Sequence, residues 1–147
     1  MARNFNMKFK CPNELGITQQ EFDLLLEVRN KLARGEMKHR KRERYFGRDE
    51  KFEVPTFNMA TWSEHLGCGQ VGCIAGWMEV ESKGKWHHSS TDWKSENLRK
   101  LFLPGDNINM DKITTHRAVR AIDNFLQGKI SNPWAGTRNE AVKNKAA

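Results

Sequence analysis

Residues 18–35 read TQQEFDLLLEVRNKLARG, and this stretch carries the strongest structural signal in the chain. Thr18 and Glu21 have the spacing of a capping box. In this motif the threonine oxygen accepts from the backbone N–H near the glutamate, and the glutamate carboxylate accepts from the backbone N–H of the threonine. Gly35 is a natural helix end. Between these ends, apolar residues recur at three- and four-residue steps and form one stripe: Phe22, Leu25, Val28 and Leu32, widened by Leu24 and Leu26. The pattern predicts an amphipathic helix over residues 19–34.

Three further segments favour helices. The clearest starts at Thr114 or Thr115 and runs to Gln127, with Gly128 just past its end. Its apolar face would consist of Ala118, Val119, Ile122, Phe125 and Leu126. Residues 70–80 are expected to be helical as well, and residues 91–102 to form a short helix. Gly72 and Gly76 would then lie on one helix face, where another element packs closely.

The chain has 147 residues, close to the usual size of one domain. No internal repeat and no β-rich pattern is visible, so the expected fold class is mainly α. We predict a small single-domain helical bundle of four to five helices. A polar arm at 1–16 precedes the domain at 17–134, which contains a basic insert at 36–53. The tail at 135–147 is small and charged and is expected to fray.

The charge and the cysteine count bound the function class. Lysine and arginine total 25 against 18 aspartates and glutamates, giving a formal net charge of +7. This excess argues against an acidic mimic of nucleic acid and favours an anionic partner. Three cysteines are an odd number, which fits reduced thiols better than a disulfide framework. The absence of a secretory h-region and of a long apolar run predicts a cytoplasmic protein that does not enter a membrane.

One block of sequence resembles a known group of proteins. Residues 57–62 read FNMATW and residues 68–77 read CGQVGCIAGW. The later matching parts are LFLP at 101–104 and the run from Arg120 to Trp134. The combination is similar to a group of small, uncharacterised phage and bacterial proteins with a CGTxxCIAGW-like helix, although Gln70 replaces the usual threonine. The resemblance implies the fold class and a phage or bacterial origin, and it implies no chemistry.

The basic run at 38–44 is the clearest partner signal. Clustered lysines and arginines can neutralise phosphates and release counterions, and Tyr45 could stack on bases or sugars. Arg117 and Arg120 on the late helix could extend this surface. The candidate residues of the run itself are Lys38, Arg40, Lys41, Arg42 and Arg44. The alternative is that the run is a solvated helix face or loop that only keeps the protein soluble.

A second hypothesis is a protein-binding module. Trp86, flanked by lysines and histidines, is the tryptophan most open to solvent in this interpretation, and it could anchor an interface. Such a module could inhibit or modulate a host or defence enzyme. A partly covered loop position for Trp86 is the alternative.

A third hypothesis is a small zinc- or thiol-dependent enzyme. The weak metal candidates are His65, Cys68, Cys73, His87 and His88, whose spacing is not that of a familiar zinc finger. Cys68 could also act as a nucleophile with His65 as its base, but no third orienting group is evident. We instead expect Cys73 to be a small buried hydrophobe.

Taken together, these patterns favour a non-enzymatic accessory protein that acts by binding. The expected partner is nucleic acid, or a host complex that handles nucleic acid, met through the basic segment. No cofactor and no resident metal are expected.

Overall fold

The computed structural model describes residues 8–42, 54–61, 63–66, 69–83, 95–105 and 107–137. Within these ranges the chain forms five α-helices and one short 3-10 helix: α1 (Pro12–Leu15), α2 (Gln19–Ala33), α3 (Ile74–Ser82), α4 (Glu96–Phe102), η2 (Met110–Lys112) and α5 (Thr115–Leu126). The predicted helix count is confirmed for this part of the chain. None of these helices combines the length and the apolar character needed to cross a bilayer.

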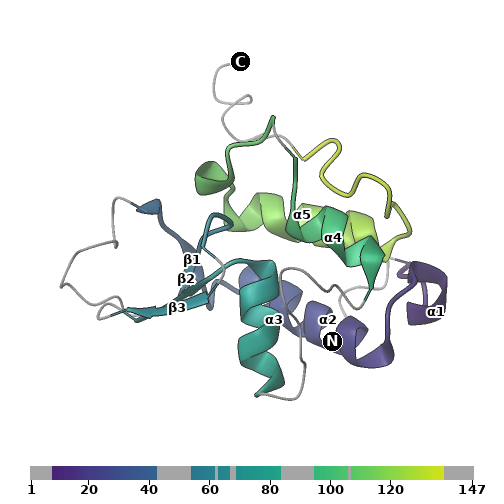
Figure 1. The fold of residues 1–147 in the computed structure, drawn as a ribbon, viewed down its shortest axis with the longest axis horizontal. Coiled ribbons are helices and arrows are strands. Elements are labelled where there is room, and N and C mark those ends of the chain that lie inside the picture. Colours follow the sequence, from purple (N-terminus) through teal and green to yellow (C-terminus); the bar gives the residue numbers. More distant parts are fainter. Residues whose placement is uncertain are drawn as a thin grey trace.

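A small mixed sheet accompanies the helices, and this corrects the prediction of a helical bundle. Its four strands are β1 (Lys38–His39), β2 (Thr56–Phe57), β3 (Ser63–Leu66) and β4 (Gly69–Gly72), in the order β1-β2-β4-β3. The β1–β2 and β2–β4 pairs are parallel, whereas β3 and β4 are antiparallel. Figure 1 shows the sheet at one end of the molecule and α1 at the other.

Helix α2 packs against α1, α3 and α5, whereas α4 packs against α5. The Thr18 Oγ1 accepts from the Glu21 backbone N–H at 3.0 Å, and the Glu21 carboxylate accepts from the Thr18 N–H at 3.0 Å, so the predicted capping box is confirmed. Leu25, Val28 and Leu32 on the predicted stripe are buried. The helix contacts both α3 and α5, so its stripe forms the centre of the core.

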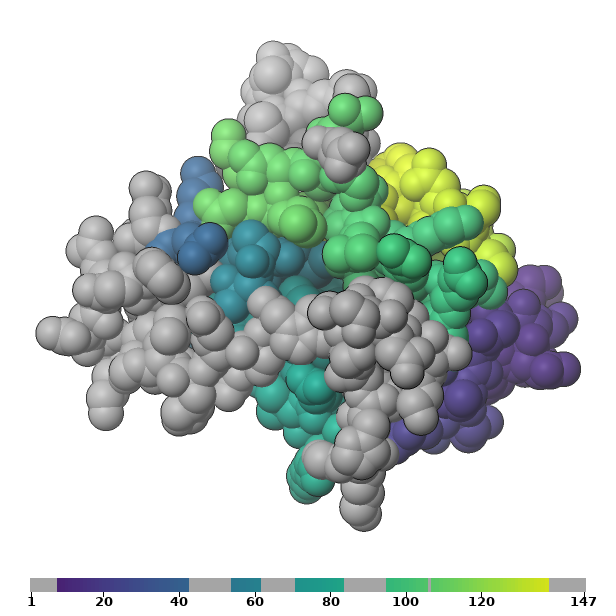
Figure 2. Space-filling model, viewed as in Figure 1, coloured from purple at the N-terminus to yellow at the C-terminus, as the bar shows by residue number. Residues whose placement is uncertain are grey.

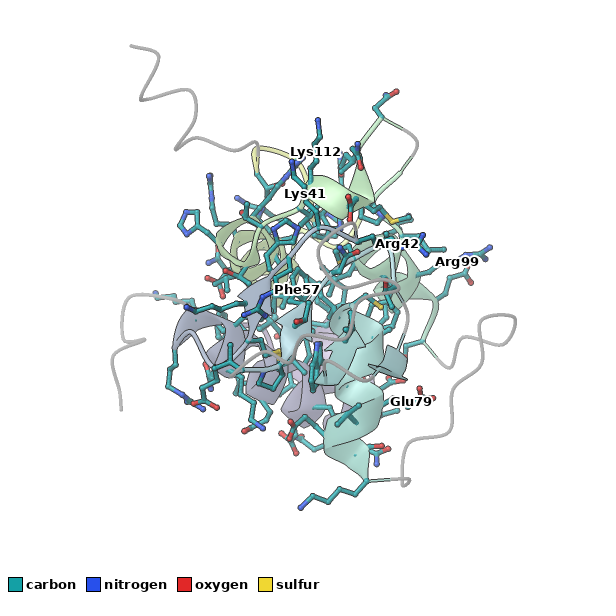
Figure 3. The ribbon with its side chains drawn as sticks, turned by 90° about the vertical axis from the view of Figure 1, so that its left-hand side faces the viewer. Lys41, Arg42, Phe57, Glu79, Arg99 and Lys112 are labelled. Carbon is teal, nitrogen blue, oxygen red and sulfur yellow. The ribbon has the colours of Figure 1, made fainter. Side chains whose placement is uncertain are left out.

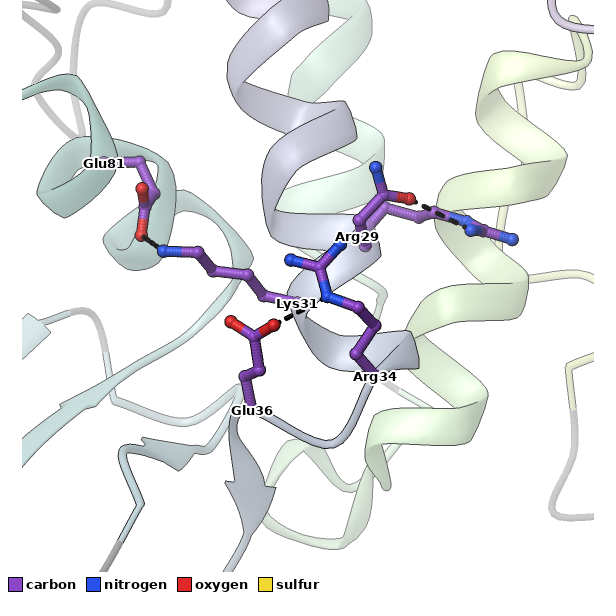
Figure 4. A network of polar contacts seen from close by, with 6 residues as sticks. Arg29, Lys31, Arg34, Glu36 and Glu81 are labelled. Carbon is purple, nitrogen blue, oxygen red and sulfur yellow. Dashed lines mark hydrogen bonds and ion pairs between the residues drawn. The ribbon is translucent and has the colours of Figure 1, made fainter. Parts of the chain in front are cut away.

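Ion pairs reinforce both of these helix contacts. Arg29 donates from Nε and Nη2 to the two carboxylate oxygens of Asp123 on α5, at 2.9 and 3.2 Å. Lys31 reaches Glu81 on α3 at 2.5 Å, as Figure 4 shows. Because the Arg29 and Asp123 side chains are only 11% and 15% exposed, this pair is screened little by water.

Residues 70–80 do not form the single predicted helix. Val71 and Gly72 belong to β4, and α3 begins only at Ile74 after the N-cap residue Cys73. Of the two glycines expected on a helix face, Gly72 is therefore a strand residue paired with Phe57 on β2, whereas Gly76 lies in α3. Strand β4 pairs with both β2 and β3, and the Gly72 backbone C=O also accepts from the Asn58 N–H at 3.0 Å, which extends the β2–β4 ladder.

Both ends of the described chain pack onto the core. In the segment predicted as an arm, α1 forms and Leu15 is fully buried. At the other end, Trp134 is buried and its Nε1 donates to the Leu101 backbone oxygen at 2.9 Å. Thr137 is also fully buried, so the beginning of the predicted tail is part of the folded unit. Residues 1–7 and 138–147 lie outside the described residues.

Replacing Asp123 by alanine should destabilise the protein strongly. The change leaves the buried Arg29 guanidinium without its carboxylate, which typically costs about 3 kcal/mol. Urea denaturation of wild type and D123A would measure the difference in the free energy of unfolding. As a control, Glu36→Gln disrupts the exposed Arg34–Glu36 pair and should leave the urea midpoint unchanged. Equal midpoints for D123A and wild type would contradict the proposed importance of the α2–α5 pair.

Candidate cationic binding surface

The side chain of Asn58 lies at the centre of the region that carries the basic run. It has no exposed area, although it is a polar amide directly after strand β2. Its Nδ2 donates to the Arg40 backbone oxygen at 2.8 Å and to Asp111 Oδ1 at 2.7 Å. Its Oδ1 accepts from the Ala60 backbone N–H at 2.7 Å. Both amide hydrogens and the oxygen are therefore satisfied, and three chain segments are joined at one side chain.

Strand β1 holds the first half of the basic run in place. The Lys38 N–H donates to the Pro55 oxygen at 2.9 Å, and the Arg40 N–H donates to the Phe57 oxygen at 3.4 Å. The Arg40 Nη1 also donates to the Thr56 hydroxyl at 2.9 Å, and its side chain is half-buried. The start of the predicted basic insert is thus a sheet edge with defined backbone partners.

Asp111 on η2 connects this edge to the segment before α5. Its Oδ1 accepts from the Arg42 backbone N–H at 2.9 Å as well as from Asn58. Its backbone oxygen lies 2.8 Å from His39 Nε2, which must carry the hydrogen because a carbonyl oxygen only accepts. Two residues of the basic run, His39 and Arg42, are therefore hydrogen-bonded to Asp111, which lies about 70 positions away in sequence.

The electrostatic environment keeps the Asp111 carboxylate ionised. Partial burial acts to raise its pKa, but the hydrogen bonds from Asn58 and from the Arg42 N–H act in the opposite direction. Electrostatic interactions with His39 and Arg42 lower it further, and the net result is a pKa below the usual aspartate value of 3.8.

Four cations project from this junction and are exposed: Lys38, Lys41, Arg42 and Lys112. We refer to these four residues as the cationic surface. In the space-filling view, atoms of residues near 40 (blue) lie beside those of residues from 110 onward (green) (Figure 2). Figure 3 shows Lys41 and Lys112 close together in the upper half of the view, with Glu79 of α3 in the lower half. Among the described residues, no carboxylate lies within ion-pair distance of Lys38, Lys41 or Lys112.

The other predicted partner residues are placed differently. Arg117 Nε donates to the Thr137 hydroxyl at 3.2 Å, and Arg120 Nη2 donates to the Gly136 oxygen at 2.8 Å. These two arginines on α5 therefore hold the C-terminal segment of the described chain. Three predicted residues lie outside the described residues: Arg44, Tyr45 and Trp86.

The structure bears on one of the five weak metal candidates. Cys73 is buried, as expected, and its Sγ accepts from the Gly76 N–H at 3.4 Å as the N-cap of α3. Burial raises the pKa of this thiol to about 11, which opposes formation of the thiolate that zinc binding requires. The part of the chain that the structure describes contains no cluster of three or more potential ligands. The remaining candidates fall outside the described side chains: His65, Cys68, His87 and His88.

Three residues of this region were not among the predicted site residues: Asn58, Asp111 and Lys112. Asn58 had one signal, since it is a polar residue between the apolar Phe57 and Met59. No feature of the sequence pointed to Asp111 or Lys112. Their place beside the basic run depends on hydrogen bonds of Asp111 that join positions 53 to 72 residues apart.

Comparison with known proteins gave no match to any family model, any curated protein or any solved structure. The similarity to phage and bacterial proteins therefore remains a prediction from the FNMATW and CGQVGCIAGW segments.

The stabilising effect of Asp111 should depend on pH. Because its pKa is lowered in the folded state, its contribution is fully present above pH 3.8 and is lost as the pH falls through the lower folded-state value. Asp111→Asn cannot titrate, so the difference in unfolding free energy between wild type and D111N should be constant near neutral pH and shrink below pH 3.8. Urea titrations at a series of pH values would measure it. A difference that grows on acidification would contradict the assignment.

Proposed function

We propose that this protein binds nucleic acid, without catalysing a reaction, through the cationic surface formed by Lys38, Lys41, Arg42 and Lys112. The observation that carries the proposal is the placement of three exposed cations from the basic run, Lys38, Lys41 and Arg42, beside a fourth from η2, Lys112. A site whose backbone is already ordered loses less conformational entropy when phosphates bind.

The local charge balance supports a polyanionic partner. Residues 38–42 and 111–112 contain five lysines and arginines and one aspartate, a net charge of +4 with His39 neutral. The single carboxylate already accepts two hydrogen bonds, so its charge is partly compensated within the protein. A phosphate backbone approaching this junction therefore meets an excess of positive charge.

The chemistry of the surface favours contact with the phosphate backbone. Lysine ammonium groups and arginine guanidinium groups neutralise phosphates whatever the base sequence, and each phosphate contact releases counterions. The aromatic side chain of strand β2, Phe57, is fully buried and unavailable for stacking. Together with the resemblance to phage and bacterial proteins, these features fit an accessory protein that attaches to nucleic acid directly or joins a complex that handles it.

Neutralising the cationic surface should weaken binding to a labelled duplex DNA or single-stranded RNA. In the triple variant Lys41→Gln, Arg42→Gln and Lys112→Gln, the slope of log affinity against log salt should become shallower by about 0.9 per lost phosphate contact on duplex DNA. Fluorescence anisotropy between about 50 and 200 mM salt would measure this slope.

A matched control removes three exposed lysines at the other end of α5: Lys8, Lys10 and Lys129. Lys10 lies at that end because its N–H donates to the Leu126 oxygen. The control lowers the net charge by the same amount and should retain most of the affinity. Equal losses in the two triple variants would overturn the proposed location. Absence of salt-dependent binding, with salt-insensitive capture of a protein instead, would favour the protein-binding hypothesis.

A further inference from the structure

Among the described residues, Asp111 is the only carboxylate at the centre of the cationic surface, and its position there presents an apparent contradiction. A negative charge among cations repels phosphate, so on charge alone it weakens the proposed site. We infer that Asp111 is nevertheless a positioning residue that strengthens nucleic-acid binding by holding Arg42 in place. This inference rests on the function proposed above.

The contacts of the basic run show what Asp111 adds. The backbone ladder between β1 and β2 ends with the bond from Arg40 N–H to the Phe57 oxygen. Beyond it, the Arg42 N–H is held by the Asp111 carboxylate, at 2.9 Å. Asp111 therefore extends the ordered part of the run from the end of the ladder to Arg42.

The same carboxylate oxygen joins the run to η2. It also accepts from Asn58, whose side chain is fully buried and is itself bonded to the Arg40 oxygen. Since Lys112 follows Asp111 directly, the bond to Arg42 sets the relative positions of cations from two distant segments. Loss of the acceptor would leave the bond from His39 Nε2 to the Asp111 backbone oxygen in place. It would let Arg42 move relative to Lys112, and binding would then have to restrict that motion.

Removal of the Asp111 carboxylate should weaken nucleic-acid binding if the side chain acts by positioning Arg42. It should strengthen binding if only its negative charge matters. Asp111→Ala removes both the negative charge and the acceptor. Asp111→Asn removes the charge but keeps an amide oxygen that can accept from both Arg42 and Asn58. The two variants have the same net charge, so a difference between their affinities reports on the acceptor alone.

If Asp111 positions Arg42, D111A should bind duplex DNA more weakly than wild type, whereas D111N should bind at least as tightly. Loss of one phosphate contact corresponds to about an eightfold weaker affinity at about 0.1 M salt, with a salt slope shallower by about 0.9. A purely structural role would not change this slope in protein that is still folded. Anisotropy titrations with the duplex DNA, over a range of salt concentrations, give both quantities.

A third variant keeps the test decisive if D111A does not fold. Asp111→Glu retains the charge but moves the acceptor outward by one methylene. It should bind more weakly than wild type if position matters and equally well if charge alone matters. Tighter binding by both D111A and D111N, or wild-type affinity in D111E, would overturn the inference and leave the proposed function intact. No binding by the wild-type protein would overturn the proposed function itself.

Discussion

The burial of one polar side chain, Asn58, constrains the sheet end of this protein. An amide without exposed area must find partners for its two hydrogens and its oxygen, because an unsatisfied polar group in the interior is costly. Here the partners are the Arg40 oxygen, Asp111 and the Ala60 N–H. Arg40 directly follows β1, Ala60 lies in the turn after β2 and Asp111 is part of η2, so Asn58 holds these three segments together.

This constraint has an electrostatic consequence. Strand β1 belongs to a run rich in lysine and arginine, and η2 brings a further lysine, so positive charges from two segments gather at one place. Such an arrangement is unfavourable for the isolated protein, because like charges repel. Asp111 offsets part of this repulsion while its hydrogen bonds fix the backbone on both sides. A surface that is costly for the protein alone is suited to a partner that supplies negative charge.

The helical core and the cationic surface depend on different interactions. In the core, α2 packs against α3 and α5 through an apolar stripe and through the largely buried pair of Arg29 and Asp123. At the surface, the segments are held by backbone hydrogen bonds and by bonds to the side chains of Asn58 and Asp111. Changes that remove exposed lysines should therefore alter binding without affecting the core, which makes the proposed function separable from stability.

The sequence by itself determined the long helices, because their signals are local. The capping box of α2 and its apolar residues at three- and four-residue steps lie within one segment, as do the apolar face of α5 and the glycine that follows it. The burial of Cys73 was likewise predictable from its apolar neighbours. The exposed character of Lys38, Lys41 and Arg42 also followed from their charge.

Only the tertiary structure decided the sheet and the composition of the cationic surface. Strands β1 and β2 have two residues each, too few to show the alternation that identifies a strand. Their parallel pairing joins positions 18 residues apart, and Asp111 meets the basic run across an even longer separation. Hydrogen bonds between such distant segments depend on how the intervening chain packs, and no local pattern in the sequence records that.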